Sequence, residues 1–307
     1  MIQTVLGRVL PETLGHFQPH EHLFVHPTPA SKKSPALEIS SEEKSLAELL
    51  EYRQKGGGAI ADAQPLGAGR DAGVLQELSR KSGVSIVAVT GYHVDMFYRE
   101  GDPLPSLGEE ALYERFSREL REGCEECVEV LPGAVKAAIG PAGSLDKFRA
   151  RLRAAARAAA DAGTALILHT QAGEDAVDAV RICGDCALAP ERILVCHVDR
   201  QAEDFSVHEA VAKTGAYLEY DTIGRFKYHD DPSEIRLILH MLERGHGDKL
   251  LLALDTTAAR LQSYGGEIGL TYLLEHFLPS LRRQGVSEEE IAQMTRRNPA
   301  KALRLET

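Results

Sequence analysis

The sequence contains no long apolar stretch and no recognisable targeting segment. No apolar run approaches the ~20 residues that a membrane-spanning helix needs, and LLLAL at 250–254 has only the length of a buried strand. The opening MIQTVLGRVLPETLG lacks a basic segment followed by an apolar one, so we expect no signal peptide. Five cysteines, an odd number without a secretory context, argue against a disulfide framework. We therefore expect a cytoplasmic protein that does not contact a membrane.

The chain also lacks an excess of basic residues. Its 307 residues include 35 Lys and Arg against 46 Asp and Glu, which gives a formal net charge of −11. An acidic chain repels a phosphate backbone, so a nucleic-acid partner is not expected. A small-molecule substrate, even an anionic one, stays compatible with this charge because a pocket can be locally basic.

Short apolar runs recur along the whole chain. Eight runs are candidate strands: one ends near His22, and the others lie at 59–64, 85–93, 134–140, 165–170, 193–198, 216–222 and 250–256. They are continuously apolar, as expected for parallel strands that are covered on both faces.

Helical patterns fill the gaps between these runs. They lie at 41–55, 70–82, 106–130, 144–163, 202–214, 232–246 and 267–284. Eight βα units in series predict an α/β protein with a (β/α)8 TIM barrel fold, formed by a single domain over residues 1–307. An open doubly wound sheet is the alternative, but no GxGxxG follows the first strand.

Unusual polar residues stand at or near the carboxyl ends of the predicted strands. They are His20, His22, Lys136, His169, His197 and Asp255. Barrel enzymes build their active sites at that end. Two histidines at i and i+2 on a strand point the same way and can reach one ion, and imidazole with carboxylate suits Zn, Mn, Fe or Co. A single strand-end histidine is more often a hydrogen-bonded core or rim residue, and Asp255 alone could cap the next loop, but the joint placement of these residues predicts a metal site.

Several motifs resemble one known family nearly from end to end. They are TVLGRVLPETLG followed by PHEHL, the lysine in AVKAAIG, the strand ends ILHT and LVCHVD, LLALD, YGG at 264–266, and RNPAKAL. With these motifs the chain resembles the phosphotriesterase-like branch of the amidohydrolase superfamily, including its lactonase members.

The resemblance implies a centre of two divalent metal ions, with zinc as the expected metal and Mn, Co or Fe as alternatives. The more buried ion would take His20, His22 and Asp255, and the more exposed ion His169 and His197. Lys136 would bridge the two ions as a carbamate, an N6-carboxylated lysine, because an ammonium has no lone pair to offer. Some relatives use Glu near this position, but AVKAAIG contains no acid.

The resemblance also implies the reaction. A hydroxide held by the binuclear centre would open a lactone, including phosphorylated sugar lactones, and Asp255 would accept its proton and pass it to the leaving group. A phosphotriesterase or another ester or amide hydrolase is the alternative. A barrel that binds a small ligand without catalysis is the alternative from another class, but it predicts missing metal ligands. The resemblance favours a homodimer.

The loops that follow the strands are expected to determine substrate specificity. The candidate substrate contacts are Tyr92, Lys227, Arg260 and Tyr264. Lys227 and Arg260 stand on the two loops that flank Asp255, and their cationic groups would suit an anionic or phosphorylated substrate. Solvated loop charges are the alternative interpretation.

Two cysteine pairs and five further histidines are not expected to belong to the site. Two C-x-x-C pairs, Cys124/Cys127 and Cys183/Cys186, could form a zinc site, but they fall in or near separate helices, so we expect reduced helix thiols. Five histidines are expected at the surface, namely His208, His229, His240, His246 and His276. Glu21 points away from its two histidine neighbours and is expected to support them rather than to bind metal.

Overall fold

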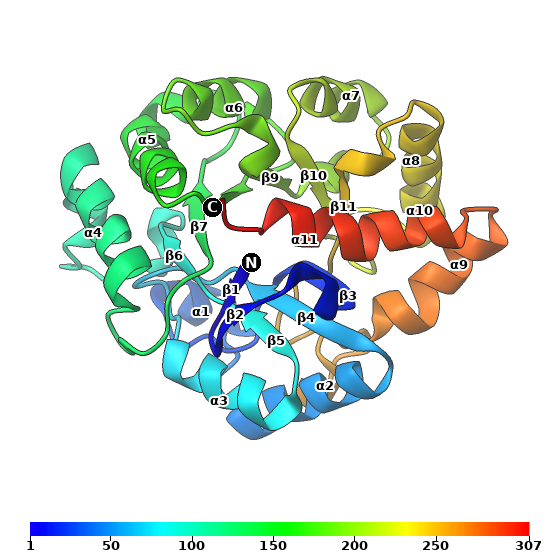
Figure 1. Cartoon of the computed structure of the whole chain (residues 1–307), viewed down its shortest axis with the longest axis horizontal. Coiled ribbons are helices and arrows are strands. Elements are labelled where there is room, and N and C mark those ends of the chain that lie inside the picture. Colours follow the sequence, from blue (N-terminus) through cyan, green and yellow to red (C-terminus); the bar gives the residue numbers. More distant parts are fainter. Residues whose placement is uncertain (307) are drawn as a thin grey trace.

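The computed structural model describes residues 1–306, in which eight parallel strand segments form a barrel with helices around it (Figure 1). The strands are β3 (His16–Glu21), β4 (Gly57–Asp62), β5 (Ser85–Val87) with β6 (Val89–Gly91), β7 (Ala134–Ala138), β8 (Ala165–His169), β9 (Ile193–Cys196), β10 (Tyr217–Tyr220) and β11 (Leu250–Leu252). Only Ala88 separates β5 from β6. β3, β4 and β5 pair in that order, and β6 to β11 pair in sequence order. The predicted TIM barrel is confirmed.

The helices alternate with the strands. They are α2 (Glu42–Gln54), α3 (Ala72–Ser82), α4 (Glu109–Glu122), α5 (Leu145–Asp161), α6 (Ala176–Gly184), α7 (Phe205–Lys213), α8 (Asp231–Glu243) and α9 (Leu278–Arg283), with the short α1 (Pro29–Lys33) in the first loop. α10 (Glu288–Ala292) and α11 (Asn298–Ala302) follow α9. Among the described residues, no helix is long and apolar enough to cross a membrane.

Local sequence explains where helices begin and end. The Ser41 side chain accepts a hydrogen bond from the Lys44 amide at the start of α2, and Asp71 accepts one from the Val74 amide at the start of α3. α3 ends at Ser82, and the next residue, Gly83, has a φ of 71°, which lies in the left-handed region that glycine adopts without a steric penalty.

The barrel interior is packed by side chains from alternate strand positions. Phe17, Ala61, Ile167, Leu194 and Leu251 belong to one buried cluster, and a larger cluster fills the space between the strands and the helices. The hairpin β1 (Ile2–Thr4) with β2 (Gly7–Val9), which the sequence analysis did not predict, precedes β3 in the chain. In the view of Figure 1, α11 crosses the middle of the molecule, close to both termini.

The seam between the last and the first strand is held partly by a side chain. The Asp255 amide donates to the His20 carbonyl at 3.3 Å, and the buried Glu21 carboxylate accepts hydrogen bonds from the amides of Leu254 (2.8 Å) and Thr256 (3.1 Å). Burial raises the pKa of Glu21 to about 8. Through these contacts Glu21 fixes the end of β11 against β3, while support of its two histidine neighbours stays a prediction.

The expected helix over 106–130 is too long at its carboxyl end. α4 stops at Glu122, because Gly123 has a φ of 105° and turns the chain. Cys124 and Cys127 therefore lie in the following turn and not in a helix. Their backbones pair there as an isolated antiparallel β-bridge. All five cysteines are free thiols, as expected.

Candidate metal centre

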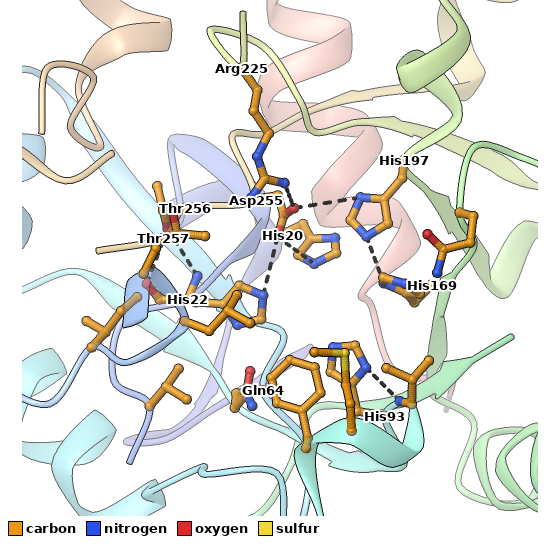
Figure 2. Close-up of a pocket in the computed structure, with 18 of the residues that line it drawn as sticks. His20, His22, Gln64, His93, His169, His197, Arg225, Asp255, Thr256 and Thr257 are labelled. Carbon is orange, nitrogen blue, oxygen red and sulfur yellow. Dashed lines mark hydrogen bonds and ion pairs between the residues drawn. The ribbon is translucent and has the colours of Figure 1, made fainter. Parts of the chain in front are cut away.

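Most of the polar residues predicted from the strand ends lie together. His20 belongs to β3 and His22 follows it, His169 ends β8, His197 follows β9 directly, and Asp255 stands three residues after β11. All five line one pocket of about 200 Å³ (Figure 2). The pocket opens at the carboxyl ends of the strands, where barrel active sites are found.

The donor atoms form two neighbouring groups. His22 Nε2 lies 3.4 Å and His20 Nε2 3.9 Å from Asp255 Oδ1, and one donor atom from each of these residues lies within 4.8 Å of the others. Beside them, His169 Nδ1 and His197 Nε2 are 2.8 Å apart. Imidazole nitrogens and a carboxylate at this spacing can hold divalent transition metals.

Two of these residues have a strained backbone. The φ of His197 is 65° and that of Asp255 is 48°, which is uncommon for residues other than glycine. Such conformations are found at functional sites, where they aim a side chain that a continuing strand would direct elsewhere. The strain is located at the two points where β9 and β11 turn into the pocket.

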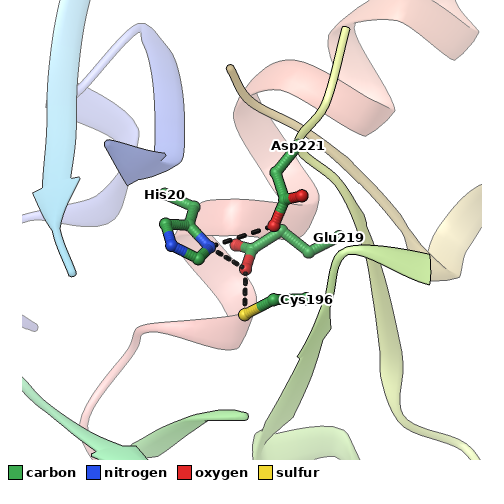
Figure 3. A group of neighbouring side chains, drawn as sticks. All are labelled: His20, Cys196, Glu219 and Asp221. Atoms are coloured by element: carbon green, nitrogen blue, oxygen red, sulfur yellow. Dashed lines mark hydrogen bonds and ion pairs between the residues drawn. The ribbon is translucent and has the colours of Figure 1, made fainter. Parts of the chain in front are cut away.

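Two carboxylates beneath the pocket orient the histidines, and Figure 3 shows both of them beside His20. Asp221 Oδ2 is 3.0 Å from His20 Nδ1, and Asp221 Oδ1 is 2.7 Å from His197 Nδ1. Glu219 Oε2 also lies 3.0 Å from His20 Nδ1 and accepts a hydrogen bond from Cys196 Sγ at 2.9 Å. A carboxylate on Nδ1 directs Nε2 to the pocket and makes it a better ligand.

The sequence analysis missed Glu219 and Asp221, although a signal was present. Both acids stand in the apolar run AYLEYDT at positions i and i+2, so they point to the same side of a strand. In the structure both are fully buried. Acids with this spacing in an otherwise apolar strand indicate a buried polar partner.

Burial keeps four histidines of the pocket in their neutral form. Desolvation lowers the pKa of His20 to about 4 and holds the pKa of His93, His169 and His197 well below its usual range. Neutral imidazole is the form that binds a metal ion. These histidines are therefore ready to act as ligands at neutral pH.

Lys136 lies deeper than the other predicted ligands. Its side chain is fully buried, with Nζ 3.2 Å from His20 Nε2 and 4.0 Å from Cys196 Sγ. Within residues 1–306, no carboxylate lies within ion-pair distance of this nitrogen, so the ordinary arrangement of a buried lysine paired with an acid is not found. A buried ammonium without a counter-charge is costly. Conversion to an anionic carbamate between two cations would remove that cost, so the surroundings of Lys136 fit the bridging role.

Two arginines reach the pocket beside Asp255. Arg225 donates a hydrogen bond to Asp255 Oδ2, and Arg200 Nη2 lies 3.5 Å from the same oxygen. Burial alone would raise the pKa of Asp255, but Arg225 and the neighbouring histidines hold that pKa well below its usual range. Neither arginine was among the predicted site residues, since loop sequence does not reveal which side chains turn inward. Both line the pocket.

The four residues expected to contact substrate lie outside the pocket lining. Arg260 is buried and donates to the carbonyls of Leu254, Asp255 and Ile223, so it braces the loops behind the pocket. Lys227 is exposed, with Nζ 4.6 Å from the centre of the Tyr228 ring.

The two tyrosines also have internal partners. Tyr92 is buried and its hydroxyl donates to Asp95 at 2.5 Å. The Tyr264 hydroxyl bonds to the backbone of Ser41 and approaches the Ser45 hydroxyl at 3.1 Å, which fixes the start of α2. The structure therefore brings the metal-ligand candidates together, but it does not bring these substrate candidates to them.

Two histidines predicted at the surface are turned inward. His208 is fully buried and lies 3.0 Å from the Tyr220 hydroxyl, and His229 is half-buried with only 6% of its side chain exposed. That prediction is wrong for both side chains, because each has a polar partner on another element. His276 is exposed, as predicted, while His240 and His246 are half-buried.

Known proteins share this architecture and these motifs. The sequence profile of the phosphotriesterase family matches residues 1–303. The chain belongs to the phosphotriesterase family. An N-acetyltaurine hydrolase from Tetraodon nigroviridis is 30% identical over 340 residues, which cover 97% of this chain and 96% of the relative. The predicted family is confirmed.

Lactonases are among the similar proteins, as the resemblance implied. A phospho-furanose lactonase from Mycoplasmopsis synoviae is 26% identical, over 98% of this chain and 91% of its own length. The crystal structure of a lactonase from Listeria monocytogenes superposes with a TM-score of 0.92 at 25% identity, covering 100% of this chain and 99% of that one.

Asp221 provides a test of how the histidines are oriented. Replacing Asp221 with Asn keeps the shape but puts an amide NH2, which cannot accept a hydrogen bond, in place of one of the two oxygens that contact the imidazoles. We expect a loss of metal affinity of about 10- to 100-fold, the usual cost of removing a carboxylate that orients a ligating histidine. Zinc titration against a competing chelator measures this loss. The exposed Asp178→Asn is the matched control, and equal affinities in the two variants would contradict the assigned role.

Proposed function

We propose that this protein is a metal-dependent hydrolase that opens the ring of a small lactone carrying an anionic group. The donor set of five histidine and aspartate residues around one pocket carries the proposal, together with family membership. Two divalent ions, with zinc as the expected metal, would be bound as the resemblance implied. His20, His22 and Asp255 would hold one ion, His169 and His197 would hold the other, and a carboxylated Lys136 would lie between them.

Bound ions of this kind supply Lewis acidity and bring the pKa of water towards neutrality. The protein's own groups then position and protect the reaction. Asp255 is held ionised, so it can accept a proton at Oδ1 or Oδ2 and return it to the leaving oxygen of the opened ring. Val25, Ile39 and Phe97 form an apolar part of the wall that keeps bulk water from the substrate.

The arginines indicate the anionic part of the substrate. Arg200 and Arg225 stand on one side of the pocket, and a guanidinium binds a phosphate or carboxylate through paired hydrogen bonds. The pocket of about 200 Å³ is suited to a small compound. A phosphorylated sugar lactone combines these properties, and a relative is named as a phospho-furanose lactonase.

Amide hydrolysis is the second candidate. The relative named N-acetyltaurine hydrolase is 30% identical over nearly the whole chain, and the same centre would act on an amide carbonyl. Parallel assays of lactones and N-acetyl amides separate the two candidates.

We also propose that the chain works as a single barrel domain in the cytoplasm, as a homodimer.

Metal removal tests the proposed chemistry. After dialysis against a strong chelator, lactone hydrolysis is expected to fall to the uncatalysed rate, because the pocket offers no serine or cysteine nucleophile. Added Zn²⁺, Mn²⁺ or Co²⁺ is expected to restore it. Ring opening is followed by the release of acid, and the metal content is measured on the same samples. Activity that persists in protein free of metal would refute the proposal.

A matched pair of cations on one loop tests the anionic substrate. Arg225→Ala is expected to raise KM for a phosphorylated lactone roughly 10- to 100-fold more than for a neutral lactone, the range for a lost charged hydrogen bond. Lys227→Ala, two residues away and exposed, is expected to change neither KM. If Lys227→Ala acts selectively and Arg225→Ala does not, the assignment of Arg225 is wrong.

A further inference from the structure

A second group of buried polar side chains lies outside the pocket. Asp199 stands in the short helical turn Val198–Gln201 after β9, His229 lies in the loop after β10, and Glu234 lies in the first turns of α8. Asp199 and Glu234 are fully buried, and only 6% of the His229 side chain is exposed. Three segments of the chain therefore meet at one buried point.

The donor atoms of this group converge. His229 Nε2 lies 3.1 Å from Glu234 Oε2, 3.1 Å from Thr222 Oγ1 and 4.0 Å from Asp199 Oδ2. One donor atom from each of Asp199, His229 and Glu234 lies within 4.8 Å of the others. An ion with ligand distances of about 2.0–2.2 Å can be reached from all three after small side-chain shifts.

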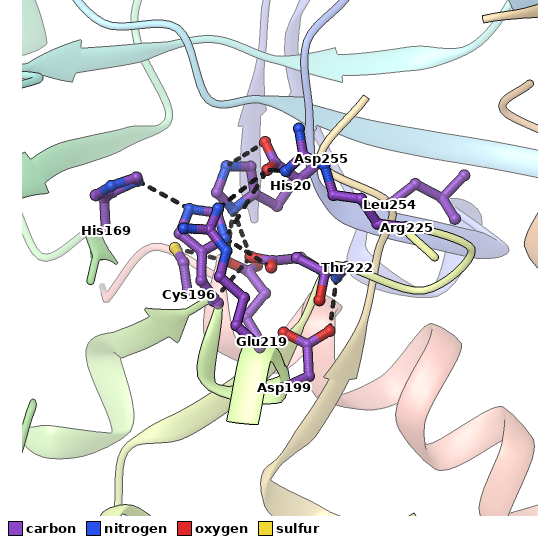
Figure 4. A network of polar contacts seen from close by, with 12 residues as sticks. His20, His169, Cys196, Asp199, Glu219, Thr222, Arg225, Leu254 and Asp255 are labelled. Carbon is purple, nitrogen blue, oxygen red and sulfur yellow. Dashed lines mark hydrogen bonds and ion pairs between the residues drawn. The ribbon is translucent and has the colours of Figure 1, made fainter. Parts of the chain in front are cut away.

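Backbone groups also contact two of these side chains, Asp199 and His229. The Thr222 amide donates to Asp199 Oδ2 at 2.6 Å, a contact visible in Figure 4. His229 Nδ1 lies 3.4 Å from the Asp230 carbonyl, on the side of the ring opposite to Nε2. A carbonyl at Nδ1 is a common means of directing the other ring nitrogen to a metal ion.

The carboxyl oxygens of this group have few partners in the protein. Asp199 Oδ1 and Glu234 Oε1 are buried without a hydrogen-bond partner within residues 1–306, and Glu234 Oε2 has only its ion-pair contact with His229 Nε2. His229 is the sole basic side chain in ion-pair contact with either acid in this part of the chain. Buried carboxyl oxygens that lack a partner are costly, and a divalent cation would supply the partner that they lack.

We propose that Asp199, His229 and Glu234 bind a divalent cation of their own, separate from the pocket centre and structural in role. Imidazole with two carboxylates favours Zn²⁺ or Mn²⁺ over Mg²⁺ or Ca²⁺. The ion would join the loop after β9, the loop after β10 and α8. Because the loop after β10 also carries Arg225 and Tyr228, which line the pocket, the ion would fix the segment that contacts the substrate.

Metal counting tests this site without relying on activity. Full-length protein is freed of metal, loaded with Zn²⁺, separated from unbound ion, and analysed for zinc per chain. Glu234→Gln and, separately, His229→Ala are each expected to bind one zinc equivalent fewer than the wild type. His240→Ala, on the same helix but outside the group, is the matched control and is expected to bind the wild-type number.

A variant of the pocket distinguishes zinc bound at this second site from zinc bound in the pocket. His169→Ala is expected to lose zinc from the pocket, whereas the equivalent that Glu234→Gln removes stays bound, so the double variant loses both. Hydrogen exchange over 222–230 is expected to slow when Zn²⁺ is added to wild type, but not when it is added to Glu234→Gln. Unchanged zinc counts in both Glu234→Gln and His229→Ala would overturn the proposal, whatever the pocket binds.

Discussion

The geometry of the pocket depends on Asp221, whose two carboxylate oxygens contact histidines from different strands. Asp221 Oδ2 lies 3.0 Å from Nδ1 of His20, in β3, and Asp221 Oδ1 is hydrogen-bonded to Nδ1 of His197, directly after β9. A single carboxylate can reach both rings only when the barrel has closed in the correct register. Barrel closure and the aiming of the two Nε2 atoms into the pocket are therefore one constraint, and Glu21 contributes to it by fixing the end of β11.

Much of the fold could be predicted from the sequence because its signals are local and repeated. Continuous apolar runs separated by helical patterns indicate parallel strands with covered faces, and parallel strands bring their carboxyl ends to one side. These signals are enough to predict that His20, His169, His197 and Asp255 lie at one end of the barrel. The left-handed backbone of His197 and Asp255 could not be predicted, since only the contacts of the folded barrel impose it.

The loops could not be predicted in the same way. Arg225 and Lys227 are two residues apart on one loop, yet the first turns into the pocket and the second faces solvent. Loop sequence has no period that would distinguish them. Arg260 was expected at the substrate because of its charge, but backbone carbonyls that no local pattern reveals take up its donors. The sequence places several cationic residues on the loops that flank Asp255, whereas tertiary contacts decide which of them reach the pocket.

Lys136 is the point on which the proposed chemistry rests. Its amine is buried beside His20, without a carboxylate partner in the described residues, and a carbamate would make it an anionic ligand. Carbon-13 NMR of the zinc-loaded protein, prepared in carbon-13 bicarbonate, tests this directly. We expect a carbamate carbon signal in the wild type and none in Lys136→Met. The absence of the signal in the wild type, or its persistence in Lys136→Met, would contradict the account.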